Sequence, residues 1–313
     1  MSSRPGDTIP SAEARSCYFS LYFSLVRLLI WLDCDFEKGS TKGRPLSPED
    51  QFAHWRRLAV TVAEAVDASS CRVVGVSGCQ GSGKSTFSSI LAEQISASGA
   101  DGNRAARAVS IDDFYLRRQE RRLLAETVHP LLVTRGVPGT HDWQWLRRVL
   151  HAMHEKRREV LVPRFDKGLD DRVGEESVAA DLLILEGWCV GVHHQPPLLL
   201  AEPCNELERR EDADRRWRTW VNEQLRDNYE PVWSMVDLWV HLRAPDFAVV
   251  RAWRSQQEQD LPESQRMTDE ELERFIAHYE RLTRWQLGGD PDGPGYAVAL
   301  DSARNVLEVT LLA

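Results

Sequence analysis

The feature that most constrains this chain is a glycine-rich run, Gly78-Cys79-Gln80-Gly81-Ser82-Gly83-Lys84-Ser85, which Thr86 follows. It matches the pattern G-x-x-x-x-G-K-[ST] in full. Glycines in such a loop allow backbone conformations in which several N–H groups point at one anion. A helix that begins at the end of the loop adds the positive end of its dipole. The run therefore predicts a nucleotide-binding loop, in which Lys84 contacts the β- and γ-phosphates and the Ser85 hydroxyl contacts Mg²⁺.

The segments beside this loop have the patterns that a phosphate-binding loop requires. A β-branched run at residues 72–77 predicts a buried strand before it, and residues 85–95 predict a helix after it. Further strands are predicted at 106–111, 180–185, 235–242 and 306–311, and helices at 48–68, 143–156, 209–228, 246–257 and 269–287. Because strands and helices alternate, we expect an α/β protein with the three-layer P-loop NTPase fold, a mainly parallel sheet with helices on both faces.

Composition divides the chain into a short N-terminal part and one large domain. Residues 17–34 are almost wholly apolar, and residues 36–48 are rich in glycine and proline. We therefore expect an apolar helix and linker over 1–48 and a kinase-sized domain over 49–313, with a lid near 246–270. The apolar segment is shorter than the roughly 20 residues of a membrane-spanning helix. A buried or partner-facing helix is the favoured interpretation, with a membrane anchor and an unpacked segment as alternatives.

The overall composition disfavours several classes of protein. The net charge of −9 argues against a general nucleic-acid binder, because such proteins usually present a basic face. The six cysteines form neither a C-x-x-C pair nor a Cys/His cluster with zinc spacing, so we expect free thiols in a reducing cytoplasm. The sequence has no clear N-K-x-D motif for reading guanine, which disfavours a GTPase.

Two acidic residues follow predicted strands and are the candidate catalytic carboxylates. Asp112 stands at the end of the strand over 106–111, and Glu186 follows the strand over 180–185. In open α/β sheets, ligands bind at the carboxyl ends of the strands. Asp112 is therefore placed to accept a proton from an attacking hydroxyl or to bind Mg²⁺, and Glu186 to hold Mg²⁺. For Asp112, the alternative is a residue that only caps a turn.

Charged loops between the predicted elements are candidates for binding an anionic substrate. One loop contains Arg135, His141 and Asp142, and another contains Arg164, Lys167 and Arg172. Cationic side chains gathered in loops suit a carboxylate or a phosphate. Ordinary surface ion pairs are the alternative interpretation of each loop.

A predicted helix after the strand over 235–242 carries two arginines that share one face. Arg251 and Arg254 are three residues apart, which is the spacing of neighbours on a helix surface. Both are candidates for a lid that closes over ATP and stabilises the charge of the transferred group. An exposed, arginine-rich helix is the alternative.

The motifs also occur in a particular order. They lie at residues 74–86, 110–116, 135–142, 163–167, 185–188, 253–258 and 267–283, and include Ser110-Ile111-Asp112-Asp113-Phe114-Tyr115 and Leu185-Glu186-Gly187-Trp188. In this order they resemble the D-glycerate 3-kinase-like family within the phosphoribulokinase/uridine kinase group of P-loop kinases. Residues 168–178 and 189–212 depart from the family pattern.

The resemblance implies an ATP- and Mg²⁺-dependent kinase that transfers the γ-phosphate to a hydroxyl of a small acid, with D-glycerate becoming 3-phosphoglycerate. It implies that Lys84 clamps the phosphates, that Asp112 is the general base, and that Glu186 serves the metal. Ser85 and Asp112 complete the expected metal site. The expected substrate residues are Asp113, Tyr115, Arg135, His141, Asp142, Arg164, Lys167 and Arg172.

Other functions stay open on the sequence. The acceptor could instead be a nucleoside, a pantothenate-like compound or a sugar phosphate, because the substrate loops are where such kinases differ. A non-catalytic ATP-binding regulator is the alternative from another class. The presence of Asp112, Glu186 and the cationic loops disfavours it. The expected partners are ATP and a small anionic metabolite, without nucleic acid or membrane contact.

Overall fold

The computed structural model describes residues 48–98, 104–259, 262–263 and 266–313. The apolar helix predicted at 17–34 and nearly all of the predicted linker lie outside the described residues. Within the described part, no helix is both long enough and apolar enough to cross a membrane.

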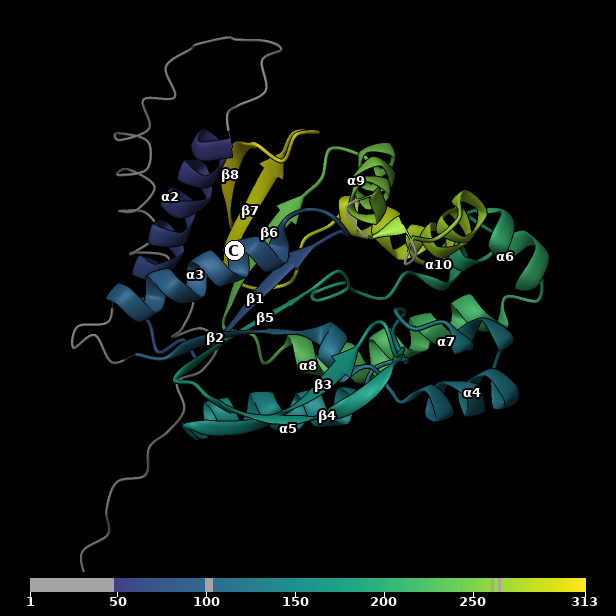
Figure 1. The fold of residues 1–313 in the computed structure, drawn as a ribbon, viewed down its shortest axis with the longest axis horizontal. Coiled ribbons are helices and arrows are strands. Elements are labelled where there is room, and N and C mark those ends of the chain that lie inside the picture. The colour runs from purple at the N-terminus through teal and green to yellow at the C-terminus, as the bar shows by residue number, and fades with distance from the viewer. Residues whose placement is uncertain (1–47, 99–103, 260–261, 264–265) are drawn as a thin grey trace, which may run out of the picture. The chain divides into compact units, whose positions relative to one another are not determined.

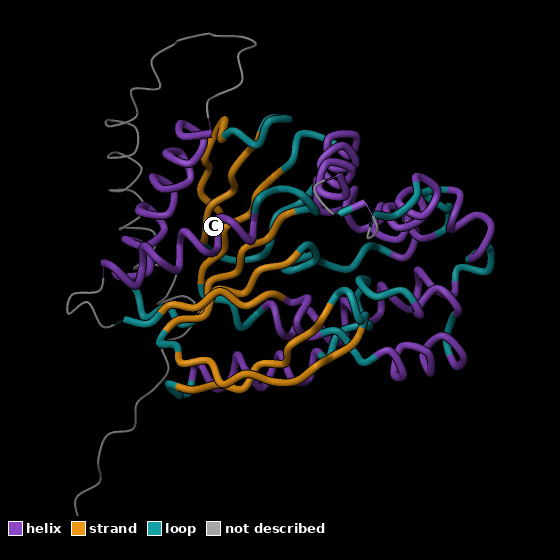
Figure 2. The backbone as a smooth tube through the Cα atoms, in the orientation of Figure 1, coloured by secondary structure: helices purple, strands orange, loops and turns teal. Residues whose placement is uncertain are grey.

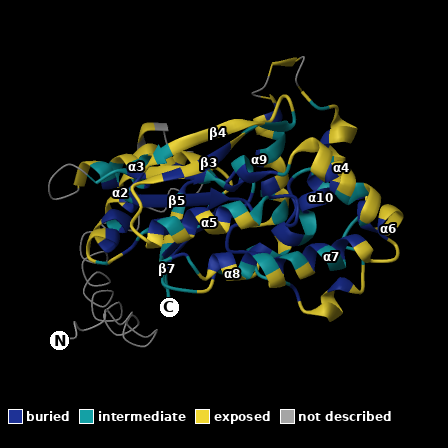
Figure 3. Cartoon of the chain, turned by 90° about the horizontal axis from the view of Figure 1, so that it is seen from below, coloured by how far each residue is buried: buried dark blue, intermediate teal, exposed yellow. Residues whose placement is uncertain are grey.

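A six-stranded sheet forms the centre of the described domain (Figure 1). Its strands lie in the order β2 (Ala106–Ser110), β5 (Leu182–Gly187), β1 (Val73–Gly78), β6 (Leu238–Arg243), β7 (Gly295–Leu300) and β8 (Val306–Leu312). The first five strands run parallel, and β8 runs antiparallel to β7. Strand β5 is buried along its whole length (Figure 3), which explains why its sequence is a continuous apolar run.

Helices cover both faces of this sheet, as the alternating pattern predicts (Figure 2). On one face, α2 (Pro48–Asp67) packs on α3 (Lys84–Ser98), which contacts β1, β2 and β5. On the other face, α5 (Trp143–His154) packs on α8 (Glu230–Trp233) and contacts β1. The buried residues of α5 are Leu146, Val149, Leu150 and Met153, whose spacing places them on one side of the helix. The expected three-layer α/β fold is confirmed.

Further helices gather toward the carboxyl ends of the strands (Figure 1). They are α4 (Arg118–Thr127), α6 (Glu206–Glu211), α7 (Arg216–Gln224), α9 (Phe247–Gln259) and α10 (Asp269–Leu287). The helix predicted at 269–287 is confirmed. Thr268 accepts a hydrogen bond from Glu271 N–H and the Glu271 side chain accepts one from Thr268 N–H, which forms a capping box.

The sequence interpretation missed an antiparallel hairpin. Strands β3 (Glu159–Asp166) and β4 (Asp171–Ala179) pair with each other outside the main sheet, where the sequence suggests only a polar loop. Pro163 within β3 and the mostly exposed, charged residues of β4 hide the strand pattern. Strand β7 and helix α4 were also missed. The hairpin matters for the site because its turn carries residues 167–170.

One predicted helix is divided in the structure. The sequence predicts a single helix over 209–228, but the chain forms α6, α7 and a π-helix over Leu225–Tyr229. Arg215, just before α7, has a left-handed backbone with φ of +67°. The Asp212 carboxylate accepts a hydrogen bond from Trp217 N–H at 2.7 Å. The helix therefore breaks where a buried carboxylate caps the next helical segment.

Candidate active site

The glycine-rich loop joins β1 to α3 at the carboxyl edge of the sheet. Gly81 and Gly83 have left-handed backbones, with φ of +78° and +91°, which explains why glycine occupies these positions. Burial raises the pKa of the Cys79 thiol to about 12, so this thiol within the loop stays neutral. Lys84 is the first residue of α3. The loop residues before it form the turn whose backbone N–H groups can bind an anion.

Ser85 and Glu186 are in contact where the loop joins α3. The parallel pairing of β1 with β5 sets Val76 opposite Glu186, and the Ser85 hydroxyl donates a hydrogen bond to Glu186 Oε1 at 3.0 Å. The Glu186 side chain is buried, and its Oε2 has no hydrogen-bond partner among the described residues. The Ser85 hydroxyl and a carboxylate oxygen with spare capacity are hard oxygen donors. These residues fit a Mg²⁺ ion.

Asp112 lies one strand away, in a 3-10 helix over Ile111–Phe114 that follows β2. The pairing of β2 with β5 sets Ser110 opposite Glu186, which brings the two acidic strand ends side by side. Asp112 Oδ1 accepts a hydrogen bond from the Tyr115 hydroxyl at 2.8 Å, and Oδ2 accepts one from Lys167 Nζ at 2.6 Å. The predicted carboxylate therefore has one neutral and one cationic partner.

The pKa of Asp112 results from opposing influences. Burial raises it, but the charge and hydrogen bond of Lys167, the hydrogen bond of Tyr115 and the charge of Lys84 outweigh burial and lower the pKa of Asp112 to about 2. The carboxyl group is consequently ionised at neutral pH. An ionised carboxylate near the Lys84 ammonium can accept a proton from a hydroxyl group that binds beside the phosphate loop.

The turn of the β3–β4 hairpin holds Lys167 in place. Buried Arg121 donates hydrogen bonds to Leu116 O at 3.2 Å, Val133 O at 3.1 Å and Asp170 O at 2.7 Å. Arg135 pairs with the Asp170 carboxylate from the other side. Sequence reasoning included Arg135 but missed Arg121, because no local pattern separates Arg121 from its exposed arginine neighbours in α4.

His141 is buried behind Asp112. It stacks on Tyr115 with ring centroids 4.6 Å apart, and its Nδ1 lies 2.9 Å from the Tyr229 hydroxyl. That hydroxyl also accepts the Gly139 N–H at 2.8 Å. Burial lowers the pKa of His141 to about 4. The imidazole is therefore neutral at pH 7, and its Nε2 has no hydrogen-bond partner among the described residues.

Several other predicted substrate residues have structural partners. Asp142 Oδ1 accepts Trp145 N–H at 2.9 Å and so caps α5. Arg172 donates to Tyr115 O at 3.0 Å and stacks over the Trp145 ring at 5.2 Å. Arg164, exposed on β3, pairs with Glu176 at 3.0 Å. Asp113 accepts Phe165 N–H at 3.5 Å, and burial raises its pKa. Their role in substrate binding stays a prediction.

Helix α9 carries the two arginines predicted for a lid. Arg251 pairs with Glu273 of α10, and Arg254 pairs with Glu258 at 2.7 Å within α9. The residue between them that reaches the phosphate loop is Trp253. A Cβ atom at Gly81 would lie 2.5 Å from the Trp253 Cβ. Helix α9 thus packs against the loop, and its predicted function as a lid stays a prediction.

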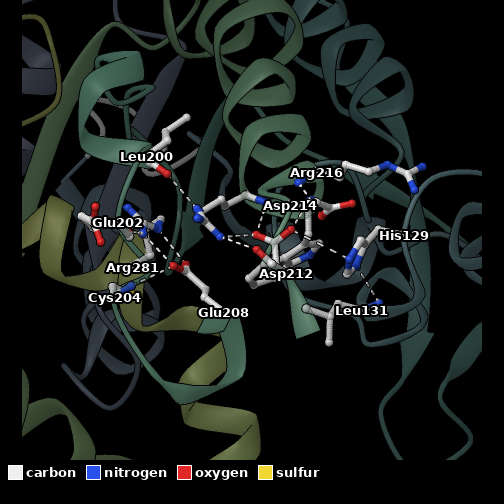
Figure 4. A network of polar contacts seen from close by, with 12 residues as sticks. His129, Leu131, Leu200, Glu202, Cys204, Glu208, Asp212, Asp214, Arg216 and Arg281 are labelled. Atoms are coloured by element: carbon white, nitrogen blue, oxygen red, sulfur yellow. Dashed lines mark hydrogen bonds and ion pairs between the residues drawn. The ribbon is translucent and has the colours of Figure 1, made fainter. Parts of the chain in front are cut away.

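A second polar cluster joins the segment after α4 to the chain between α6 and α7 (Figure 4). Its ligand atoms on His129, Asp212 and Asp214 lie within 4.8 Å of one another. Asp212 is already paired with buried Arg218 at 2.7 Å. His129 Nδ1 accepts Leu131 N–H at 3.3 Å, and its Nε2 lies 3.9 Å from Asp212 Oδ1. His129 and Asp212 are buried and Asp214 is exposed, so these contacts form a polar network that links the segment after α4 to the chain between α6 and α7.

Comparison with known proteins shows what this domain is similar to. No protein-family model matches the chain. The chain is 34% identical over 229 residues to the uncharacterized kinase mug58 of Schizosaccharomyces pombe, covering 66% of this chain and 78% of that protein. It is 32% identical over 222 residues to the probable ATP-dependent kinase TDA10 of Saccharomyces cerevisiae, covering 65% and 73%.

A solved structure gives the same result. The D-glycerate 3-kinase from Cryptococcus neoformans is 26% identical and superposes with a TM-score of 0.65, covering 84% of this chain and 98% of that protein. The chain therefore belongs to the D-glycerate 3-kinase-like family of P-loop kinases.

Proposed function

We propose that this protein is an ATP-dependent kinase that phosphorylates a hydroxyl group of a small anionic metabolite, with D-glycerate as the favoured acceptor and 3-phosphoglycerate as the product. One observation carries the proposal. The ionised Asp112 carboxylate lies close enough to Lys84 to feel its charge, and it is hydrogen-bonded to Lys167 from a separate hairpin. A phosphate clamp, a base and an anion-binding cation are thus assembled around one point.

The donor half of the proposed site is the loop over 78–86. Its backbone N–H groups and Lys84 bind the phosphates of ATP, and the start of α3 adds positive potential. Ser85 and Glu186 would hold Mg²⁺. When bound there, the ion would supply charge neutralisation at the phosphate oxygens. Because Glu186 Oε2 is buried and has no described partner, it has capacity for that ion.

The acceptor half is placed around Asp112, which Lys167 of the hairpin turn contacts at 2.6 Å. Asp112 accepts the proton of the attacking hydroxyl. Lys167 and Arg135, which pair with Asp112 and Asp170 in this structure, would turn to the carboxylate of the substrate. The neutral His141 ring, whose Nε2 has no partner among the described residues, is available for a hydrogen bond to a substrate. An acceptor with both a hydroxyl and a carboxylate matches this set. D-glycerate is such a molecule, and it is the substrate in the printed name of the Cryptococcus neoformans relative.

The test is ATP consumption by the purified full-length chain with Mg²⁺ and a panel of acceptors. The panel contains D-glycerate, L-glycerate, uridine, pantothenate and ribulose 5-phosphate, and ADP release is followed in each case. We expect turnover that depends on D-glycerate, with phosphorus NMR showing the phosphate on the terminal hydroxyl. Turnover with uridine or pantothenate alone would replace the acceptor and keep the kinase. No acceptor-dependent turnover would contradict the proposed function itself.

A pH profile tests the contact between Lys167 and Asp112. In Lys167→Met the cation that lowers the Asp112 pKa is removed, so burial is less opposed and the pKa of this carboxyl rises. Because the wild-type pKa is about 2, we expect no acid limb of kcat/KM from Asp112 between about pH 4 and 8 in the wild type, and an acid limb that moves into this range in Lys167→Met. Exposed Lys156 gives the matched control, Lys156→Met. Profiles that superimpose for the wild type and Lys167→Met would show that this contact does not set the pKa of the base.

A further inference from the structure

The turn between β7 and β8 reaches the outer side of the phosphate loop. Arg304 in this turn donates a hydrogen bond from Nε to Gly81 O at 2.5 Å. Arg304 has a left-handed backbone with φ of +67°, which is uncommon for a residue with a side chain. Asp301 holds the turn, because its Oδ1 accepts the N–H groups of Ala303 and Asn305 at 2.8 Å. The turn is therefore built to present Arg304 to the loop.

Helix α9 supplies the other half of this contact. The Trp253 indole donates a hydrogen bond to Ser302 O at 2.8 Å, and the Arg304 guanidinium lies 5.0 Å from the centre of the Trp253 ring. Arg304 Nη1 donates to Gln256 Oε1 at 3.1 Å. Trp253 also packs directly on Gly81. Three separate segments thus meet at the Gly81 peptide.

The peptide that joins Gly81 to Ser82 has both of its polar groups engaged. Its C=O accepts from Arg304, and its N–H donates to Cys79 O at 3.2 Å. Glycine permits this peptide to rotate at low cost, since no Cβ opposes positive φ. A rotated peptide turns its carbonyl oxygen toward the inside of the loop, where the oxygen repels an anion. The contact with Arg304 opposes that rotation.

We propose that Arg304 and Trp253 are positioning residues that hold the phosphate loop in its anion-binding conformation and connect it to helix α9. Neither residue is expected to touch the transferred phosphate. This inference rests on the proposed function, in which the loop over 78–86 binds the phosphates of ATP. It predicts a defect in ATP binding, separate from acceptor binding and from the chemical step.

The test compares Arg304→Ala, Arg304→Lys and Trp253→Phe with the wild type. A hydrogen bond from a charged donor is lost in Arg304→Ala, so we expect the Kd and KM for ATP to rise about 10-fold or more. The kcat at saturating ATP and the KM for the acceptor are expected to stay close to the wild-type values. Arg304→Lys keeps the charge but not the planar group over Trp253, so it restores binding only in part. Trp253→Phe loses the bond to Ser302 O and weakens ATP binding less than Arg304→Ala.

Exposed Arg148 on α5 gives the matched control, Arg148→Ala, which is expected to bind ATP like the wild type. Unchanged ATP affinity in Arg304→Ala would overturn the inference, as would equal losses in ATP binding, acceptor binding and kcat. Lys84→Met is measured in parallel. If Lys84→Met weakens ATP binding and Arg304→Ala does not, only the inference fails. If neither variant changes ATP affinity, the proposed role of the loop fails instead.

Discussion

Asp112→Asn is expected to lower kcat by about 10²-fold or more while the Kd for ATP stays close to the wild-type value. Asparagine has nearly the same shape and can still accept the Tyr115 hydroxyl, but it cannot take a proton from the attacking group. The Lys167 ammonium also loses its anionic partner. The phosphate loop lies in another segment and is unchanged, so the variant removes only the proposed base. Steady-state kcat with both substrates saturating and a separate titration of ATP binding measure the two effects.

Asp67→Asn is the matched control for this variant. Asp67 is also a carboxylate paired with one cation, Arg104 at 2.8 Å, but it lies at the end of α2, away from the loop. It is expected to keep the wild-type kcat. Full turnover in Asp112→Asn would contradict the role of Asp112 as general base and would leave it as a residue that only holds Tyr115 and Lys167 in place.

The sequence predicted the strand, loop and helix that carry the donor half of the proposed site, because these elements are encoded by short, local signals. A buried strand, a glycine-rich loop and a helix follow each other without a gap at residues 73–98. Asp112 and Glu186 each stand at the end of a strand, and parallel strands end at the same edge of a sheet. The pairing of Ser110 with Glu186 confirms that the two ends are neighbours. No long-range information was needed to bring these groups together.

The acceptor half could be predicted only as a set of charged residues. Which cation reaches Asp112 depends on the β3–β4 hairpin, and its strand β4 is mostly exposed and rich in charged residues. The turn is held by Arg121, whose partners lie in three separate segments of the chain. In the same way, Arg304 contacts Gly81 across more than two hundred residues. Contacts of this kind arise from tertiary packing, and neither spacing nor periodicity encodes them.

The charged residues that the sequence places in one group have two different kinds of partner in the structure. Asp142 caps α5 by accepting the Trp145 N–H. Arg172 donates to the carbonyl of Tyr115 and so positions Tyr115, whose ring stacks on His141. Lys167 instead contacts Asp112, the proposed general base. A loop rich in charge therefore contains both supporting residues and candidate ligands, and a sequence pattern cannot separate the two. Variants of Arg172 are accordingly expected to affect folding as well as turnover.

Lys84→Met is expected to raise the Kd for ATP and to lower kcat/KM by about 10² to 10³-fold, the range found when one preorganised donor to a developing negative charge is lost. Methionine keeps most of the length and apolar volume of lysine, so the start of α3 is preserved while the point charge at the phosphates is lost. Lys156→Met is the matched control, because Lys156 is exposed at the end of α5. Isothermal titration with ATP and steady-state kinetics give the two values.

The contrast between Lys84→Met and Asp112→Asn separates the two halves of the proposed site. Lys84 acts on the donor, so its loss weakens binding of ATP and also removes charge stabilisation during transfer. Asp112 acts on the acceptor hydroxyl, so its loss leaves the ATP affinity in place. Because the Lys84 charge also lowers the pKa of Asp112, the two losses are not expected to be additive in the double variant. Wild-type ATP affinity in Lys84→Met would contradict the assignment of the loop. If the loss in kcat/KM of the double variant equals the product of the two single losses, Lys84 and Asp112 act independently and the expected coupling is contradicted.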